Sequence, residues 1–330
     1  MARTYNVYGI GNALVDIQHR VEPDFLEQAG IAKGLMTLID EDRHNALMAE
    51  LKGMPSGRAS GGSAANTTIG VANLGGTARY ACQVADDSFG DFYLKDMDAA
   101  GVSCNPDSRG QGITGKCLVF ITPDADRTMN TFLGISGSFG PEQLEEGAIA
   151  DSDYLYIEGY LIAADGGFEA ARAAQQMAGQ HGTRVALTLS DPSIVAAFMP
   201  RMKELVTEGV DLLFCNEEEA MAFTDAGDVD QACSGLAECV GGYAVTCGAE
   251  GAVVYNGKES AKVPGFKVDA VDTNGAGDMF AGAYLFGITN GYDVTQSAKL
   301  AAYASSRVVA KYGPRLDVPL RGEVNRIIDL

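Results

Sequence analysis

The sequence lacks any apolar stretch long enough to cross a membrane, and it has few basic side chains for its size. Its 330 residues include 24 lysines and arginines against 44 aspartates and glutamates, which gives a formal net charge of -20. Such a chain repels nucleic-acid backbones and anionic lipid, so we expect no nucleic acid and no membrane as a partner. A small phosphate ligand stays open, because backbone amides at a helix start bind phosphate whatever the net charge.

We also expect no disulfide framework, no targeting segment and no flexible linker. The seven cysteines form no Cys-x-x-Cys pair and are odd in number, so we expect a reduced, cytoplasmic compartment. The first residues reach Asp16 before any apolar segment of signal-peptide length, and there are no internal repeats, low-complexity tracts or Pro-rich linkers. With 46% hydrophobic and 21% charged residues, the composition is that of an ordinary folded protein.

Short β-rich runs alternate with helix-like segments over most of the chain. Two long helix-like segments, at 166–182 and 192–209, separate such runs. Alternating strands and helices predict a parallel sheet that is covered on both faces. The runs that we expect to form this sheet lie at 77–85, 152–159, 183–190, 210–216 and 243–248.

A smaller set of strands follows a different pattern. Val15, Ile17 and Val21 alternate with polar neighbours, and similar alternation appears at 34–40 and 116–134, where the sequence PDAD marks a hairpin turn. We expect these pieces to form a small β lid, with the boundaries 12–40 and 111–135. The remaining segments, 1–11, 41–110 and 136–330, are assigned to the large α/β domain.

Two glycine-containing stretches imitate nucleotide-binding motifs without their context. Gly9 and Gly11 precede a segment with the alternation of a strand, whereas a dinucleotide fingerprint needs a helix there. The stretch GQGITGK, residues 110–116, has the spacing of a P-loop, but Cys117 stands where that motif has Ser or Thr. We interpret both as chance matches.

The stretch NGAGD carries the strongest chemical signal. Gly275, Ala276 and Gly277 allow several backbone N–H groups to face one point, and the apolar run 279–288 predicts a buried helix that begins there. Those amides lie at the positive end of the helix, so they suit an anion, and Asp278 beside them suits a base that accepts a hydroxyl proton. The alternative reading is that Asp278 only caps a helix after a glycine turn.

Four stretches together resemble signatures of the ribokinase-like, or PfkB, family of sugar and nucleoside kinases. They follow the family's order and are spread over most of the chain: ASGGSAANTTIGVANLGG (59–76), CNEEEA (215–220), VTCGAEG (245–251) and VDTNGAGD (271–278). The segments 11–44 and 126–134 are most similar to the adenosine kinase branch. The resemblance implies a ribokinase-like three-layer α/β/α fold with a mostly parallel sheet and a β-sheet lid.

The resemblance also implies roles at the reacting centre. Asp278 would be the catalytic base, Gly275 to Gly277 the anion hole, and Arg127 on the hairpin a neutraliser of phosphate charge. A solvated hairpin charge is the plainer reading of Arg127. The sugar hydroxyls would be held by Asn12 and Asp16, with the pocket completed by Gly61, Gly62 and Asn66.

ATP and Mg2+ are the implied cofactors. Asn216 and Glu219 would organise magnesium through water, although both also fit a helix start. By the same resemblance, Asp272 is a candidate ligand of K+. The implied nucleotide-binding positions are Asn216, Glu219, Thr246, Gly248, Gly251 and Asn274.

The base-binding residues depart from the family pattern. Leu161 and Ser193 stand where adenosine kinases have aromatic side chains, although Tyr160 is adjacent. An apolar slot would instead come from Met36, Met129 and Leu133. The three histidines, His19, His44 and His181, match no motif and are expected to pack or to lie on the surface.

Three functions follow from these observations. The first is ATP-dependent phosphorylation of the 5'-hydroxyl of a nucleoside, with adenosine as the expected substrate. The second is a PfkB sugar kinase for ribose, fructose or a related carbohydrate, and the third is a non-catalytic nucleoside-binding regulator. The sequence does not distinguish a monomer from a homodimer.

Overall fold

A nine-stranded sheet forms the centre of the molecule. The computed structural model describes residues 3–105, 107–124 and 126–329. Within them, the strand order is β16-β15-β14-β13-β12-β11-β1-β5-β7. All neighbours are parallel except β14 with β15 and β15 with β16. The bounds are β1 Tyr5–Ile10, β5 Ala78–Ala81, β7 Ser103–Cys104, β11 Ser152–Ile157, β12 Arg184–Thr188, β13 Leu212–Asn216, β14 Tyr243–Thr246, β15 Ala252–Tyr255 and β16 Ser260–Val263.

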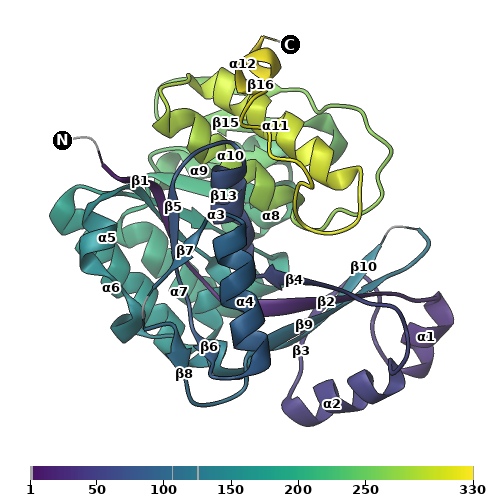
Figure 1. The fold of residues 1–330 in the computed structure, drawn as a ribbon. Coiled ribbons are helices and arrows are strands. Elements are labelled where there is room, and N and C mark those ends of the chain that lie inside the picture. The colour runs from purple at the N-terminus through teal and green to yellow at the C-terminus, as the bar shows by residue number, and fades with distance from the viewer. Residues whose placement is uncertain (1–2, 106, 125, 330) are drawn as a thin grey trace.

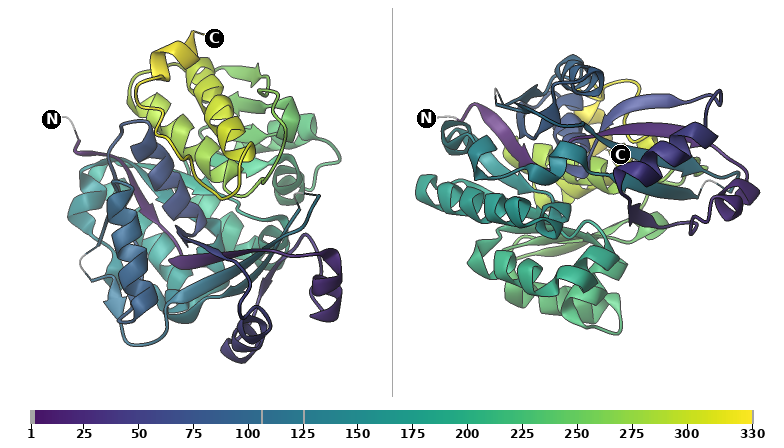
Figure 2. Two further views of the ribbon diagram at one scale, coloured as in Figure 1. Left: turned by 45° about the vertical axis from the view of Figure 1, so that its right-hand side comes forward. Right: turned by 90° about the horizontal axis from the view of Figure 1, so that it is seen from below.

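Helices cover both faces of this sheet (Figures 1 and 2). Each face has its own hydrophobic core. Successive strand residues point to opposite faces, so Val7 belongs to one core and Tyr8 to the other. On the Val7 side lie α3 Ser63–Asn73, α4 Ser88–Ala99, α10 Ala276–Thr289, α11 Val294–Val309 and α12 Val324–Ile328. On the Tyr8 side lie α5 Glu146–Ala150, α6 Asp165–His181, α7 Pro192–Gly209, α8 Glu217–Thr224 and α9 Val229–Cys239. The three-layer α/β/α prediction is confirmed.

A second sheet of five strands projects from the body and carries two short helices (Figure 1). Its order is β3-β10-β9-β2-β4, with β3 Met36–Leu38, β10 Arg127–Phe132, β9 Gly115–Ile121, β2 Leu14–Arg20 and β4 Gly57–Gly61. The helices α1 Pro23–Gln28 and α2 Glu41–Glu50 belong to the same region, and α2 packs on β10. Both β4 and α2 fall in the segment 41–110, which the sequence analysis assigns to the large domain.

The predicted hairpin is present, and both motif look-alikes precede strands. β9 and β10 pair antiparallel, with Arg127 opposite Ile121, as the PDAD turn predicts, although residue 125 of that turn lies outside the described residues. Gly9 and Gly11 lead into the strand β2, and GQGITGK leads into the strand β9, so neither precedes the helix that a nucleotide motif requires. In the part of the chain that the structure describes, no helix is long and apolar enough to cross a membrane.

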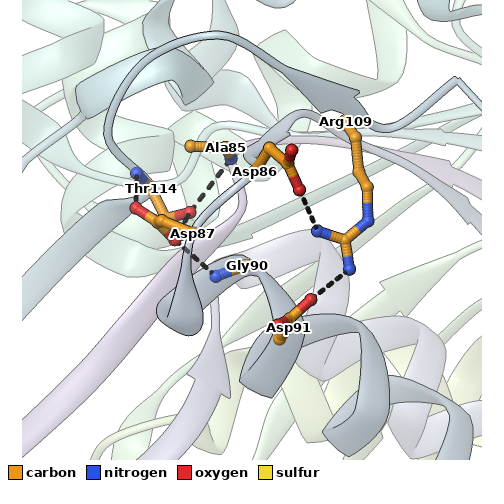
Figure 3. A network of polar contacts seen from close by, with 7 residues as sticks. All are labelled: Ala85, Asp86, Asp87, Gly90, Asp91, Arg109 and Thr114. Carbon is orange, nitrogen blue, oxygen red and sulfur yellow. Dashed lines mark hydrogen bonds and ion pairs between the residues drawn. The ribbon is translucent and has the colours of Figure 1, made fainter.

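A polar network fixes the point where the chain enters the small sheet (Figure 3). Asp87 caps α4 by accepting from the amide of Gly90 at 2.8 Å, and it accepts from both the amide and the hydroxyl of Thr114. The Thr114 hydroxyl in turn accepts from the amide of Ala85, next to the short pair β6 Val84–Ala85 and β8 Arg109–Gly110. Arg109 pairs with acids on both sides of the cap. The base of the small sheet is therefore tied to the body.

Candidate active site

The two sheets enclose a cleft of about 270 Å³ at the carboxyl ends of the central strands. β1, β11, β12 and β13 end beside it, at Ile10, Ile157, Thr188 and Asn216. In open α/β sheets, ligands bind at this edge, because the strand order reverses there and the following segments diverge. The small sheet supplies the opposite wall.

Asp278 lies in the first turn of α10 and borders the cleft. Its carboxylate accepts from the hydroxyl of Ser63 at 2.8 Å and from the side-chain amide of Asn66 at 3.0 Å. Burial raises the pKa of Asp278, while these two hydrogen bonds and the charge of Arg127 act in the opposite direction. The acid is therefore aligned and partly desolvated, as a general base needs to be.

The loop before Asp278 has the geometry of an anion site. Gly275 has a φ of 74°, and a Cβ there would lie 2.3 Å from the carbonyl oxygen of Pro314, so glycine is required. A Cβ on Gly277 would meet nothing within 4 Å, which leaves the loop open toward the cleft. The amides of Gly277 and Asp278 are in the first helical turn, where a helix offers no carbonyl partner. An anion bound in the cleft would supply one.

Arg127 reaches this loop from the small sheet. It is the first residue of β10, and its guanidinium donates to the side-chain carbonyl of Asn274, next to Gly275. Asn274 is buried, and its amide donates to Asp272 at 2.9 Å. The structure thus joins the lid hairpin to the anion loop through this side-chain contact.

A polar pocket next to Asp278 brings the predicted sugar-binding residues together. Asn12 and Asp16 line the cleft and are 5% and 6% exposed. Glu158 accepts from both the backbone and the side-chain amide of Asn12, and from the amide of Ala64 at 2.9 Å. Burial raises the pKa of Asp16 and of Glu158 to about 7. Polar groups held in this way suit a ligand with adjacent hydroxyls.

The two predicted glycines of this pocket have different positions. Gly62 has a φ of 101° and lines the cleft, and a Cβ there would lie 2.1 Å from the carbonyl oxygen of Asn12. Gly61 is not among the lining residues, but its Cβ would lie 2.2 Å from a carboxylate oxygen of Asp16. Gly61 therefore acts on the cleft by leaving space for that carboxylate.

At the other end of the cleft, Asn216 and Glu219 form a capping box at the start of α8. The Asn216 side chain accepts from the amide of Glu219 at 2.8 Å and donates to its carboxylate at 2.8 Å. Burial raises the pKa of Glu219 to about 7, with nearby acids adding to the effect. The helix-cap reading is thus confirmed, and the pair also lines the cleft, where its role toward magnesium stays a prediction.

Besides Gly61, three predicted positions lie outside the cleft lining. Thr246 lines it, whereas Gly248 and Gly251 form the turn after β14, in which the amide of Cys247 donates to the Gly251 carbonyl. Asp272 is fully buried behind the anion loop, and it accepts from the amides of Asn274 and Gly313. Its present role is to shape the loop.

The apolar wall of the cleft matches the predicted slot. Met36, Met129, Leu133 and Tyr160 all line it. Leu161 and Ser193 do not: Leu161 is buried in the core, and the Ser193 hydroxyl bonds to Asp191 at the start of α7. Their neighbours Tyr160 and Ile194 take the inward positions. Tyr160 is therefore the aromatic side chain that this pair of neighbours contributes to the cleft.

Sequence reasoning missed several residues of the site. Ser63 directly follows the Gly-Gly pair, and Glu158 is an acid near the end of the predicted strand run 152–159, so each had a weak positional signal. Ser190 had none; it lines the cleft with a φ of 70°. The described lining residues include four acids, Asp16, Glu158, Glu219 and Asp278, but only one cation, Arg127. Such a cleft suits a polyanionic ligand only if a metal cation accompanies it.

The fold and site are those of a class of α/β enzymes in which a small β-sheet faces an acid at the start of a helix. The model of the pfkB family carbohydrate kinases matches residues 40–321, and the chain belongs to this family. The chain is 40% identical to the adenosine kinase of Sinorhizobium meliloti, with a TM-score of 0.93 and coverage of 98% of this chain and 99% of that chain. It is 36% identical to a probable sugar kinase from Rhizobium etli, with a TM-score of 0.93 and coverage of 98% of both chains. Over 92% of this chain and 95% of the relative, it is 29% identical to the adenosine kinase of Saccharomyces cerevisiae.

Proposed function

We propose that this protein is an ATP-dependent kinase that phosphorylates the 5'-hydroxyl of a nucleoside, with adenosine as the preferred substrate. The observation that carries the proposal is the position of Asp278 in the first turn of α10, where Ser63 and Asn66 align its carboxylate. The similarity to two adenosine kinases over almost the whole chain supports the same substrate.

In this proposal Asp278 accepts the proton of the substrate hydroxyl. The substrate oxygen forms a bond to the γ-phosphorus of ATP. The bond between that phosphorus and the β,γ-bridging oxygen breaks, and ADP is the leaving group. The amides of Gly277 and Asp278 stabilise the charge on the transferring group, and Arg127 from the lid adds its positive charge. Asn12 and Asp16 hold the ribose hydroxyls, and closure of the lid excludes water, so that ATP is not hydrolysed.

Magnesium fits the charge balance of this cleft. Glu219 has a raised pKa because its charge is desolvated and faces other acids, and a nearby cation would stabilise it. Among the described residues, no cluster of three potential ligands is present, so the protein would hold Mg2+ mainly through water and the ATP phosphates. When bound, the ion would screen phosphate charge, while Asn216 and Glu219 order its water shell.

The proposal includes three further elements. The lid comprises residues 12–61 and 111–135, because β4 belongs to the small sheet. A K+ site beside Asp272 is included as well and is tested by comparing turnover in potassium and sodium salts. A reduced, cytoplasmic compartment is supported by the seven free cysteines.

The test is a phosphoryl-transfer assay with ATP and four acceptors: adenosine, inosine, ribose and fructose. We expect adenosine to be phosphorylated with the highest kcat/KM, and the product to be the 5'-monophosphate. A thermal-shift series with the same compounds reports binding independently, since a bound ligand stabilises the folded state. Absence of transfer to every acceptor, with adenosine still bound, would favour the non-catalytic regulator.

A sugar kinase is the second candidate, and a specific observation favours it. The wall formed by Met36, Met129 and Leu133 offers thioethers and an aliphatic side chain instead of a pair of aromatic rings. Stacking between aromatic rings contributes strongly to the affinity for a base. The similarity to a probable sugar kinase points the same way. Ribose or fructose as the best acceptor in the assay would establish this alternative.

A further inference from the structure

Arg315 is a partly buried arginine that the reaction scheme leaves unused. It follows α11, its side chain is 15% exposed, and it is not among the residues that line the cleft. Its guanidinium donates to three partners: the carboxylate of Asp96 at 2.9 Å, the hydroxyl of Ser60 at 2.7 Å and the side-chain oxygen of Asn66 at 3.2 Å. Asn66 is the same residue that donates to Asp278.

The contact with Arg315 determines how the Asn66 amide is oriented. A guanidinium has only donors, so the amide oxygen of Asn66 has to face it. The amide nitrogen then faces the cleft, where it donates to Asp278 at 3.0 Å. With the amide reversed, its oxygen would face the carboxylate, and the two acceptors would repel each other. Asp96 and Ser60 hold the guanidinium in place for this task.

Arg315 also lies near Asp16, because its partner Ser60 adjoins Ala59, the residue that pairs with Asp16 between β4 and β2. Burial is the largest influence on the pKa of Asp16 and raises it, and Arg315 is the strongest influence in the opposite direction. The other groups that face Asp16 are Arg127, which favours the carboxylate, and Asp278 and Asp272, which disfavour it. The thiol of Cys117, opposite Asp16 on β9, also interacts with it.

We propose that Arg315 is a positioning residue of the phosphoryl-transfer site, which fixes the Asn66 amide against Asp278 and places a positive charge near Asp16 without contacting the substrate. This inference rests on the proposed function, because it assigns Asp278 and Asp16 their tasks in it. It predicts two separable effects of Arg315. One is on kcat, and the other is on the acidic side of the pH profile of kcat/KM for the nucleoside.

The kinetic test compares Arg315→Met, Arg315→Lys and the matched control Arg79→Met. Arg79 is 16% exposed and bonds to one carboxylate, Glu145, and one serine hydroxyl, Ser103, but not to a residue of the cleft. In Arg315→Met we expect kcat to fall about ten- to a hundredfold, because Asn66 loses its fixed orientation. We expect the acid limb of kcat/KM for the nucleoside to move up by about one pH unit.

Arg315→Lys separates the two effects. The ammonium keeps the charge, so the acid limb should return toward that of the wild type, whereas kcat should stay low because the three-way fork is lost. If Arg315→Met does not fold, kcat of Arg315→Lys decides whether Arg315 has the positioning role. Wild-type kcat in Arg315→Lys, or an unchanged acid limb in a folded Arg315→Met, would overturn the proposal. So would equal losses in Arg79→Met.

A measurement without turnover keeps this inference apart from the proposed function. The carboxyl carbon of Asp16, labelled with ¹³C and assigned by Asp16→Asn, is titrated by NMR in the wild type and in Arg315→Met. We expect its midpoint to rise in Arg315→Met, and an unchanged midpoint would contradict the role of Arg315. If the wild type phosphorylates no nucleoside or sugar, the proposed function fails, and this titration still decides whether Arg315 favours the ionised form of Asp16.

Discussion

Three acids of the cleft, Asp16, Glu158 and Glu219, share a pKa raised to about 7 because burial removes water from their charged forms. Their surroundings differ. Glu158 accepts hydrogen bonds from Asn12 and Ala64, and Glu219 accepts them from Asn216, whereas Asp16 depends on more distant charges. Of these three acids, Asp16 is therefore the one whose protonation state we expect to respond most to a change in nearby charges.

A substitution at Gly61 tests whether the position of the Asp16 carboxylate matters for substrate binding. In Gly61→Ala the new Cβ would lie 2.2 Å from the Asp16 carboxylate, so the carboxylate has to move. We expect KM for the nucleoside to rise by about tenfold or more, since the ribose hydroxyls lose a fixed acceptor, with a smaller change in kcat.

The control is Gly57→Ala on the same strand, β4. Its Cβ would meet only the side-chain oxygen of Gln18, at 3.7 Å, which is an ordinary contact. We expect kinetics close to those of the wild type. An unchanged KM in Gly61→Ala, or an equal rise in both variants, would show that Asp16 does not hold the substrate.

At the scale of elements, the lid depends on α2, which is anchored on the small sheet through His44. His44 is 2% exposed and packs against the ring of Phe132 on β10. Burial lowers its pKa to about 4, and the charge of Lys116 on β9 adds to the effect. His19 on β2 is also buried, and burial lowers its pKa too. The packing of α2 therefore requires a neutral imidazole.

The lid should consequently lose stability in acid. The pKa of His44 is about 4 when folded, against the ordinary value of 6.5, so below 6.5 the unfolded chain binds a proton that the folded chain excludes. The free energy of unfolding therefore falls as the pH decreases from 6.5 toward about 4. The stabilising contribution of neutral His44 is fully present only above pH 6.5. We expect the thermal midpoint to drop less in His44→Leu than in the wild type between about pH 8 and about pH 5.

His181→Leu is the matched control, because His181 lies at the exposed end of α6, where it contacts Glu146. Its curve should follow that of the wild type. Parallel curves for the wild type and His44→Leu would mean that the imidazole does not couple α2 to pH.

At the scale of the whole molecule, the net charge of -20 and the four acids of the cleft oppose the binding of a bare triphosphate. We expect the affinity for ATP to fall by about tenfold or more when Mg2+ is removed with EDTA, because one arginine and the helix mouth remain to offset the phosphate charge. Nucleoside affinity, measured by calorimetry in the same buffers, should not change. Equal ATP affinity with and without Mg2+ would contradict this account.

Much of the architecture could be predicted from the sequence, because apolar runs and helical segments alternate along the body. β4 could not, since Arg58, Ala59 and Ser60 have no apolar alternation and become a strand only by pairing with β2. The cleft shows the same division. Asp278 stands in a local motif, whereas Arg315 reaches Asn66 across 249 residues of sequence, and only the folded chain brings them together.

The central claim is that Asp278 removes the substrate proton while the backbone amides at the N-terminus of α10 hold the transferring phosphoryl group. Single-turnover phosphorylation of adenosine by Asp278→Asn tests it most directly, with adenosine binding measured in parallel. We predict a loss of about a hundred- to ten-thousandfold in the rate of transfer, with adenosine affinity close to that of the wild type. A near-normal rate of transfer in Asp278→Asn would contradict the account.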